Sequence, residues 1–250
     1  MKIRGFTLIE MVITMLVSSI LVLGIAGFVE LGTKGYAQSV DRQRLQTQAK
    51  FALEKMTREA RHAVPNVFIA DGNCLSFFPI IDSGFYAVSG SDINFIVGNP
   101  SASVSTLSDK QLLINPTQML SPTDGLGALK NSFDLSSVVE ISDPNISGAT
   151  FSLPDKAPEL IGGSVVNRLY ISADNRKVSY CVGGSRVTRE VGFSDSPRPL
   201  TDASEVSVSG AVSYTPASVQ HNGVVHIDLS FKQSDETTRF QQDVQVLNVP

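Results

Sequence analysis

The chain opens with a long stretch that carries almost no polar residues. From Met11 to Val29, nineteen residues pass without a charge, and the few polar ones carry only hydroxyl groups. About 20 apolar residues cross the hydrocarbon core of a bilayer as a helix, so the pattern predicts a membrane-spanning segment over residues 8–30. Lys2 and Arg4 precede it, and positive charge on a short flank keeps that end in the cytoplasm.

Beyond Val29 the pattern becomes that of an amphipathic helix. Apolar residues recur at steps of three and four, with basic residues on the other faces. This stripe consists of Leu45, Ala49, Ala52, Met56, Ala60 and Ala63. Because the residue before a proline avoids helical angles, Pro65 is expected to end the helix. A continuous helix over residues 6–64 would be roughly 85 Å long, and its second half is expected to pack on the rest of the protein.

After Pro65 the sequence predicts β-strands separated by turns. Strand-like runs cover residues 73–79 and 92–97, whereas residues 98–137 are rich in Ser, Pro, Asn and Gly and predict loops with short strands. A meander is then expected to begin near Arg168. Its strands would cover 169–171, 177–182 and 186–191, with turns at 174–175 and 183–184.

The last part of the chain shows the clearest alternation. Apolar residues alternate with polar ones from Val225 to Phe231, which predicts a strand with one buried face. A turn at 234–236 leads to a further strand over 239–248. The predicted fold class is therefore α+β, with one long N-terminal helix packed on antiparallel β-sheet formed by residues 65–250.

Charge is distributed unevenly along the chain. Residues 1–64 carry a net charge of +4 and the remainder carries −8, which suggests two environments rather than one uniform globule. No basic patch interleaved with aromatic residues occurs in the acidic part, so a nucleic-acid partner is not expected.

Three interpretations of the N-terminal segment follow from its residues. A secretory signal peptide would find small residues for cleavage at 35–37, but the apolar run exceeds the usual length and Glu10 lies at its edge. An uncleaved signal anchor holding a periplasmic domain explains the length and the orientation. It leaves Glu10 unexplained, because a charge in the middle of a bilayer costs roughly 2.5–3.5 kcal/mol.

The third interpretation is a resemblance carried by residues 2–10. Lys-Ile-Arg-Gly followed by Phe-Thr-Leu-Ile-Glu resembles the leader and cleavage site of type IV prepilins and type II secretion pseudopilins. Their pattern is a short basic leader ending in glycine, then Phe-Thr-Leu-[Ile/Leu]-Glu, then an apolar helix. The resemblance implies that a membrane-bound prepilin peptidase cuts between Gly5 and Phe6 and N-methylates Phe6. Residues 1–5 would be a cleaved leader, and the apolar run would stay in the mature protein.

The same resemblance gives Glu10 a role. Cleavage exposes the amine of Phe6, which is mostly cationic at neutral pH, and Glu10 lies one helical turn deeper. Opposite charges attract strongly at low dielectric, and ionisable residues within membranes are usually paired. The resemblance implies that Glu10 meets the N-terminal amine of a neighbouring subunit during filament assembly. The alternative is that Glu10 reaches the headgroup interface or its own N-terminus.

The remaining sequence is similar to a subgroup of the family. The segment Tyr180 to Arg189, with the pattern Tyr-Cys-Val-Gly-Gly-x-x-x-x-Arg, and the final strand resemble J-type pseudopilins and W-type minor pilins. The nearest likeness is to O-type minor pilins of mannose-sensitive haemagglutinin (MSHA) pilus systems. The family often has a helix-breaking proline in the first half of the helix, where this chain has Gly24 and Gly27, so any loosening of the helix on assembly is open.

No constellation of catalytic residues is evident. The chain has no G-x-S-x-G, S-x-x-K or H-E-x-x-H motif. Its three histidines, His62, His221 and His226, are scattered and fit surface positions better than metal ligands or bases. We therefore expect no enzyme activity, no metal and no cofactor, and a binding or structural role instead.

The two cysteines, Cys74 and Cys181, lie in predicted strands. An exported body reaches an oxidising compartment, so a disulfide between them is expected. The alternative is two buried free thiols that act as small hydrophobic residues.

Two functions fit the resemblance. The first is a minor pilin that is anchored in the inner membrane before assembly and helps to initiate or cap a type IV pilus. The second is a minor pseudopilin of type II secretion; a membrane-anchored periplasmic binding domain is a third possibility from another class. The implied partners are the prepilin peptidase, the inner-membrane assembly platform, the lipid bilayer, and major and other minor pilins through the N-terminal helix.

Overall fold

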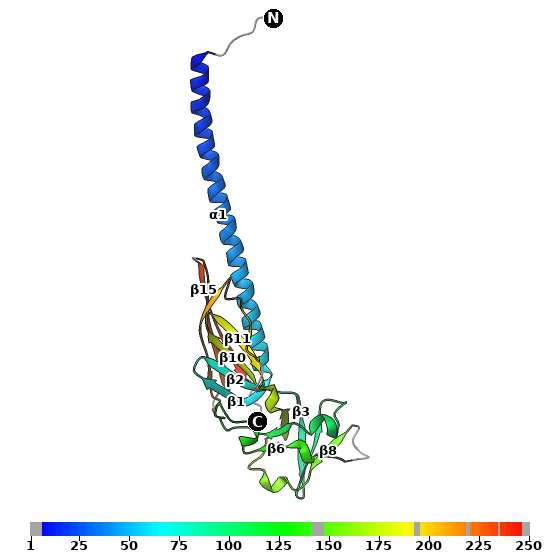
Figure 1. Cartoon of the computed structure of the whole chain (residues 1–250). Coiled ribbons are helices and arrows are strands. Elements are labelled where there is room, and N and C mark those ends of the chain that lie inside the picture. Colours follow the sequence, from blue (N-terminus) through cyan, green and yellow to red (C-terminus); the bar gives the residue numbers. More distant parts are fainter. Residues whose placement is uncertain (1–6, 142–147, 193–195, 219–220, 235, 247–250) are drawn as a thin grey trace. The chain divides into compact units, whose positions relative to one another are not determined.

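The computed structural model describes residues 7–141, 148–192, 196–218, 221–234 and 236–246 (Figure 1). The cleavage and methylation positions predicted at Gly5 and Phe6 lie outside these residues. The chain divides into two compact units, residues 1–47 and 48–250, and all three β-sheets belong to the second unit. One long N-terminal helix followed by antiparallel sheets confirms the predicted α+β class.

Helix α1, Leu8–Arg61, is the first element, and Gly24 and Gly27 do not interrupt it. In the second unit its predicted stripe is buried, at Ala49, Ala52, Met56 and Ala60. Burial of one helical face against the sheets is the main source of stability for such a segment, because helix propensity alone contributes little.

The helix ends before the position predicted from Pro65. It stops at Arg61, and strand β1, Ala63–Asp71, begins two residues later and contains Pro65. The pairing of β1 with its neighbour is irregular up to Phe68, and Asn66 has a positive φ of 63°. Proline is tolerated at such a bulge because its missing N–H removes no regular ladder hydrogen bond. Pro65 therefore marks an irregular strand rather than a helix end.

A five-stranded antiparallel sheet has the order β1-β2-β10-β11-β12. Its other strands are β2 (Cys74–Pro79), β10 (Val178–Gly183), β11 (Arg186–Val191) and β12 (Arg198–Pro199). The predicted hairpin between β10 and β11 is confirmed. Gly184 and Ser185 form its turn with φ angles of 57° and 62°, as a type I′ turn requires.

A three-stranded antiparallel sheet follows, formed by β13 (Ser207–Thr215), β14 (Gly223–Gln233) and β15 (Glu236–Val246). The alternation predicted in β14 is confirmed, because its apolar residues from Val225 to Phe231 are buried and the residues between them are not. The turn that joins β14 to β15 lies at the predicted position.

A seven-stranded antiparallel sheet has the order β6-β5-β9-β3-β4-β8-β7. Its strands are β3 (Asp82–Ser89), β4 (Asp92–Val97), β5 (Gln111–Ile114), β6 (Ser132–Asp134), β7 (Val139–Ile141), β8 (Thr150–Leu153) and β9 (Arg168–Ser172). The strand predicted over 92–97 is confirmed as β4. The region predicted to hold loops and short strands contains β5 and β6, together with the short helix α2 (Val104–Leu107) and two 3₁₀ turns.

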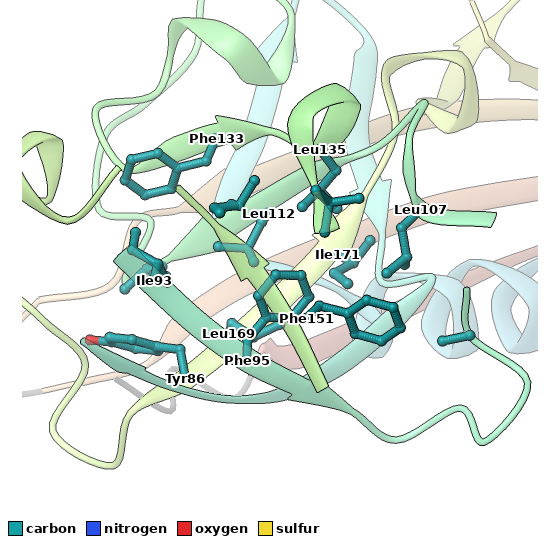
Figure 2. Close-up of a cluster of buried hydrophobic side chains, with 14 residues drawn as sticks. Tyr86, Ile93, Phe95, Leu107, Leu112, Phe133, Leu135, Phe151, Leu169 and Ile171 are labelled. Atoms are coloured by element: carbon teal, nitrogen blue, oxygen red, sulfur yellow. The ribbon is translucent and has the colours of Figure 1, made fainter. Parts of the chain in front are cut away.

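One apolar cluster forms the core of the seven-stranded sheet (Figure 2). Phe95 and Phe151 lie with ring centroids 5.6 Å apart, and Leu112 and Ile171 are fully buried beside them. Tyr86 places its hydroxyl where it accepts a hydrogen bond from the backbone N–H of Ser164, at 2.9 Å. This sheet therefore has a core of its own. A second buried cluster joins it to the five-stranded sheet, because Leu113 and Tyr170 pack there with residues of β1 and β2.

The meander predicted from residue 168 is wrong at its first step. Strand β9 pairs with β3 and β5 in the seven-stranded sheet, whereas β10 belongs to the five-stranded sheet. The chain between them forms a 3₁₀ turn at Asp174–Arg176, and Asp174 accepts a hydrogen bond from the backbone N–H of Leu126 at 2.7 Å. The segment expected to form a hairpin turn therefore binds the loop at Leu126 and connects the seven-stranded sheet to the five-stranded sheet.

The seven-stranded sheet is an insertion within the five-stranded one. All of its strands come between β2 and β10 in the sequence, yet β2 and β10 are direct neighbours in space. The chain leaves the five-stranded sheet after Pro79 and returns at Val178, which is paired close to that exit. Two crossings of the chain therefore connect the insertion to the five-stranded sheet.

Candidate functional site

The first candidate site is the start of helix α1. The backbone N–H groups of Glu10 and Met11 both donate to the carbonyl of Thr7, at 3.1 and 3.2 Å, which fixes the first turn. Glu10 lies in this turn and is exposed. An acid is favourable at that position because the helix dipole places partial positive charge at its N-terminus. Among the described residues, no side chain or backbone donor contacts its carboxylate.

The surface that follows Glu10 is apolar and uncovered. Within the described residues, the large apolar side chains from Leu8 to Val29 are all about half exposed or more, with Leu8 at 83%. The hydroxyls of Thr14 and Ser19 donate to carbonyls one turn earlier, at 3.0 and 2.8 Å. By length and composition this part of α1 is suited to crossing a membrane. These two hydroxyls are therefore satisfied within the helix, as a lipid environment requires.

The second candidate site lies near the other end of α1 and was not foreseen as a site from the sequence. Glu59 accepts hydrogen bonds from the Tyr180 hydroxyl at 2.6 Å and from Arg189 Nε at 2.9 Å, both on the same carboxylate oxygen, Oε2. Lys55, one turn earlier in the helix, approaches the other oxygen at 3.1 Å. The two residues at the ends of the Tyr-to-Arg sequence pattern therefore meet on one acid of the helix.

The environment of Glu59 explains its charge state. Burial acts to raise the pKa of this carboxyl, but hydrogen bonds from Arg189, Tyr180 and Lys55 together outweigh it and hold the pKa below its usual range. Burial and the neighbouring carboxylate both raise the pKa of Tyr180, so its hydroxyl remains a donor. Glu59 is thus an ionised link that joins the helix to strands β10 and β11. Its geometry suits a structural role.

A disulfide joins Cys74 and Cys181, with an S–S distance of 2.02 Å. The two cysteines are directly opposite each other on the adjacent strands β2 and β10. The N–H of Val182 donates to the carbonyl of Asn73 at 3.0 Å, as expected beside a pair whose own backbone groups are not bonded to each other. Side chains are closest at such positions, so the bridge fits the sheet. It also closes the covalent loop that contains the whole seven-stranded insertion.

The histidines do not gather into one site. His226 donates from Nδ1 to the Asp243 carboxylate at 2.7 Å, and its Nε2 shares a hydrogen bond with the Thr215 hydroxyl at 3.0 Å. Across the described part of the chain, no group of three His, Cys, Asp or Glu side chains is placed to hold a metal ion.

Comparison with known proteins gives one match. Residues 1–26 match the model of the prokaryotic N-terminal methylation motif. Neither the curated proteins nor the solved structures contain a significant match to the chain. Proteins with this motif are processed by a prepilin peptidase and are structural rather than enzymatic, and an apolar helix close to the N-terminus fits a single-pass anchor in the inner membrane. The motif, the helix and the antiparallel sheets that follow it together support a type IV pilin-like protein.

Proposed function

We propose that this protein is a minor pilin of an MSHA-like type IV pilus and helps to initiate or cap the filament. The observation that carries the proposal is the methylation motif over residues 1–26, which includes the start of helix α1 and its exposed apolar surface. In this proposal the prepilin peptidase cuts between Gly5 and Phe6 and methylates the new terminal amine of Phe6.

The mature chain then has two parts with different surroundings. Residues 8–30 hold it in the inner membrane before assembly, as the first part of helix α1, and the sheet region, which begins with β1 at Ala63, forms a periplasmic domain. During assembly the lipid is exchanged for the helices of other pilins, and the assembly platform moves the subunit into the filament. An apolar surface on which the hydroxyls of Thr14 and Ser19 are bonded within the helix suits both surroundings.

Glu10 supplies the attraction between subunits in this proposal. Its carboxylate would pair with the terminal amine of Phe6 in a neighbouring subunit, as opposite charges do at low dielectric. Support comes from its exposed position in the first turn of α1, where no donor among the described residues satisfies it. A pairing between chains would also fix the axial register of each incoming helix.

The size of the sheet region supports a position at the tip. The seven-stranded insertion adds a second core to the domain that the helix carries. In the shaft this bulk would recur at every subunit and would crowd its neighbours, whereas at the tip it occurs once. Adhesion by the exposed domain would follow from the same position.

The mature N-terminus tests the proposal directly. Protein purified from pili-producing cells is expected to begin with N-methylated Phe6 by mass spectrometry, and antibodies against the sheet region are expected to label filament tips. An intact Met1 would overturn the pilin reading and favour a membrane-anchored binding domain. Labelling along the whole filament would reject the position at the tip.

A pseudopilin of type II secretion is the second candidate, because the same N-terminal motif serves both systems. Neighbouring genes and a deletion strain separate the two. Genes for a pilus motor and an adhesin, with loss of surface filaments on deletion, favour the minor pilin. Genes for a secretin, with loss of secreted hydrolases on deletion, favour the pseudopilin.

A further inference from the structure

The edges of the three sheets differ in how they are protected. An open strand edge presents unpaired N–H and C=O groups and serves as a template for another chain, so proteins usually shorten or interrupt it. In the described part of the chain, β12 has two residues, and β6 and β7 have three each. Strand β1 is irregular around Asn66. The edge of β13 is already in use, because the backbone N–H of Val208 donates to the carbonyl of Ser185 at 2.9 Å. These five edges are therefore poor templates.

Strand β15 is the exception. It runs for eleven residues in unbroken register with β14, without proline or lysine, and no described strand pairs with its outer side. Gln233 of β14 and Glu236 of β15 are the pair that flanks the two-residue turn, so their backbone N–H and C=O groups bond to each other. Along the two strands, pairs with such bonds then alternate with pairs that lack them. By this alternation the backbone groups of every second residue from Thr237 to Gln245 point away from β14. These groups form the unpaired row.

A groove of about 580 Å³ runs along the same strand. Phe240 and Gln242 of β15 line one side, and helix α1 lines the other. The helix contributes Lys50, Leu53, Glu54, Thr57, Arg58 and Arg61, with His62 beyond its end. The unpaired row of β15 thus lies beside a hollow that is deep enough to hold side chains.

The groove is basic and holds an unsatisfied polar group. Lys50, Arg58 and Arg61 are exposed, and none of them forms an ion pair within the described residues, so they outnumber the single acid, Glu54. Thr57 is only 7% exposed, and its hydroxyl has no hydrogen-bond partner among the described residues. Buried hydroxyls are nearly always bonded, so an unbonded one in a residue that lines the groove is unusual.

We propose that β15 and this groove bind an extended, acidic segment of another subunit as an added strand. Main-chain hydrogen bonds to the outer row of β15 would supply affinity, and alternate side chains would enter the groove. Acidic side chains at those positions would meet Lys50, Arg58 and Arg61. The inference rests on the proposed function in taking the partner to be a second pilin-like subunit of the same assembly.

A second copy of this chain is a poorer occupant. Two β15 strands related by a two-fold axis would pair antiparallel, and residues 48–61 of the two helices would then run in opposite directions. Subunits that are anchored in one membrane, or that share one filament, have their helices pointing the same way. The added strand is therefore assigned to a different subunit.

Peptide binding to the full-length protein in detergent tests the inference. The probes are two fluorescent ten-residue peptides, one alternating Thr and Glu and the other alternating Thr and Lys. The acidic peptide is expected to bind, and the basic one is not. Arg58→Glu is expected to weaken binding about tenfold or more, whereas the same charge reversal at Lys130→Glu, in the seven-stranded insertion, is expected to have no effect. Equal binding of both peptides would overturn the inference.

A strand-blocking variant separates edge pairing from simple charge attraction. Gln241→Pro removes an N–H that points away from β14, so the sheet should remain intact while the added strand loses a partner. Binding of the acidic peptide is expected to be lost in Gln241→Pro and kept in Gln241→Ala, with similar melting temperatures. Retained binding in Gln241→Pro would reject strand addition. A wild-type dimer that Gln241→Pro converts to a monomer would reject the choice of occupant.

The cellular readout distinguishes this inference from the proposed function. Gln241→Pro is expected to be processed to methylated Phe6 like the wild type but to enter filaments poorly. Normal incorporation with normal processing would overturn the docking inference and leave the minor pilin proposal standing. Absence of methylated Phe6 in the wild type would overturn the proposed function, and with it the partner assigned here.

Discussion

The two ends of helix α1 each present an acid, and the two acids differ in how they are satisfied. Glu59 receives hydrogen bonds from Tyr180 and Arg189 and lies next to Lys55, all within the same compact unit. Glu10 stands at the edge of an apolar surface with no described donor. The first arrangement completes a fold, whereas the second leaves the carboxylate without a donor among the described residues. The difference separates the half of the helix that stabilises the domain from the half to which the proposed function assigns assembly.

This contrast predicts two separate sets of mutant effects. Changes near the N-terminus should alter processing and assembly while the sheet region stays equally stable. Changes near Glu59 or the disulfide should alter stability while processing continues. A single substitution that changed both processing and the stability of the sheet region would contradict this separation.

The largest expected effect is a block of processing in Gly5→Glu. The resemblance to prepilins implies that the peptidase requires a small residue before the cut, so a long acidic side chain should prevent cleavage completely. An immunoblot of whole cells should show only the longer precursor, and mass spectrometry should find no methylated Phe6. Gly5→Ala, which remains small, is the matched control and should be cleaved. A normally shortened Gly5→Glu protein would contradict the motif-based cleavage site.

The next effect is a loss of assembly in Glu10→Leu. Removing a charge from an apolar helix should leave membrane insertion intact or improve it, by up to about 3 kcal/mol if the site is deep. Filament incorporation should fall, because the amine of the neighbouring subunit loses its counter-charge. Sheared pili and membrane fractions measured by immunoblot separate the two effects. Glu30→Leu removes an exposed acid at the far end of the apolar run and serves as the control, with the loss of only its ion pair to Lys34.

Wild-type pili in the Glu10→Leu strain would remove the inter-subunit role of Glu10. In that case the acid would serve its own chain, at the headgroup interface or at its own N-terminus. The melting temperature of the sheet region should be unchanged in either case, because Glu10 belongs to the other compact unit.

The sequence predicted those parts of the fold that depend on neighbouring residues. The alternation in β14 and the Gly-rich turn between β10 and β11 are local signals, and both are confirmed. The predicted placement of β9 was wrong because distant residues decide strand pairing. The local sequence at Asp174 predicts a hairpin turn, but its carboxylate binds the backbone N–H of Leu126 in another loop. Pro65 was misread because a bulge in β1 accommodates it.

The candidate sites divide in the same way. The motif around Glu10 is contiguous, so it is visible in the sequence. The link at Glu59 and the groove beside β15 each combine residues more than one hundred positions apart, and only the fold brings them together. The net positive charge of residues 1–64 is consistent with a basic groove, but the local sequence does not show which of these Lys and Arg side chains lack an ion-pair partner.

Removing the disulfide should lower the stability of the sheet region. The bridge closes a loop of 107 residues, for which chain entropy gives roughly 4.7 kcal/mol as an upper figure, and about 2–4 kcal/mol is typical. Cys74→Ala/Cys181→Ala should therefore unfold at a lower denaturant concentration than the wild type, while processing at Gly5 continues. Wild-type protein treated with a reductant should match the double variant. Equal unfolding midpoints for oxidised wild type and variant would show that the bridge adds no stability.

The smallest effect, and the sharpest test of the comparison, is expected at Glu59. Glu59→Gln keeps the shape but removes the charge that Arg189 and Tyr180 bind, so the domain should lose roughly 1–2 kcal/mol at neutral pH. The pKa of Glu59 is lower in the folded protein than its value of about 4.3 in an unfolded chain. Its stabilising effect is then complete above that value and is lost as the pH falls through the folded pKa. The gap between wild type and variant should therefore shrink below about pH 4. Denaturant unfolding at several pH values measures it, with Glu54→Gln as an exposed control on the same helix. A gap that stays constant down to pH 3 would mean that packing, rather than the ionised link, holds the helix to β10 and β11.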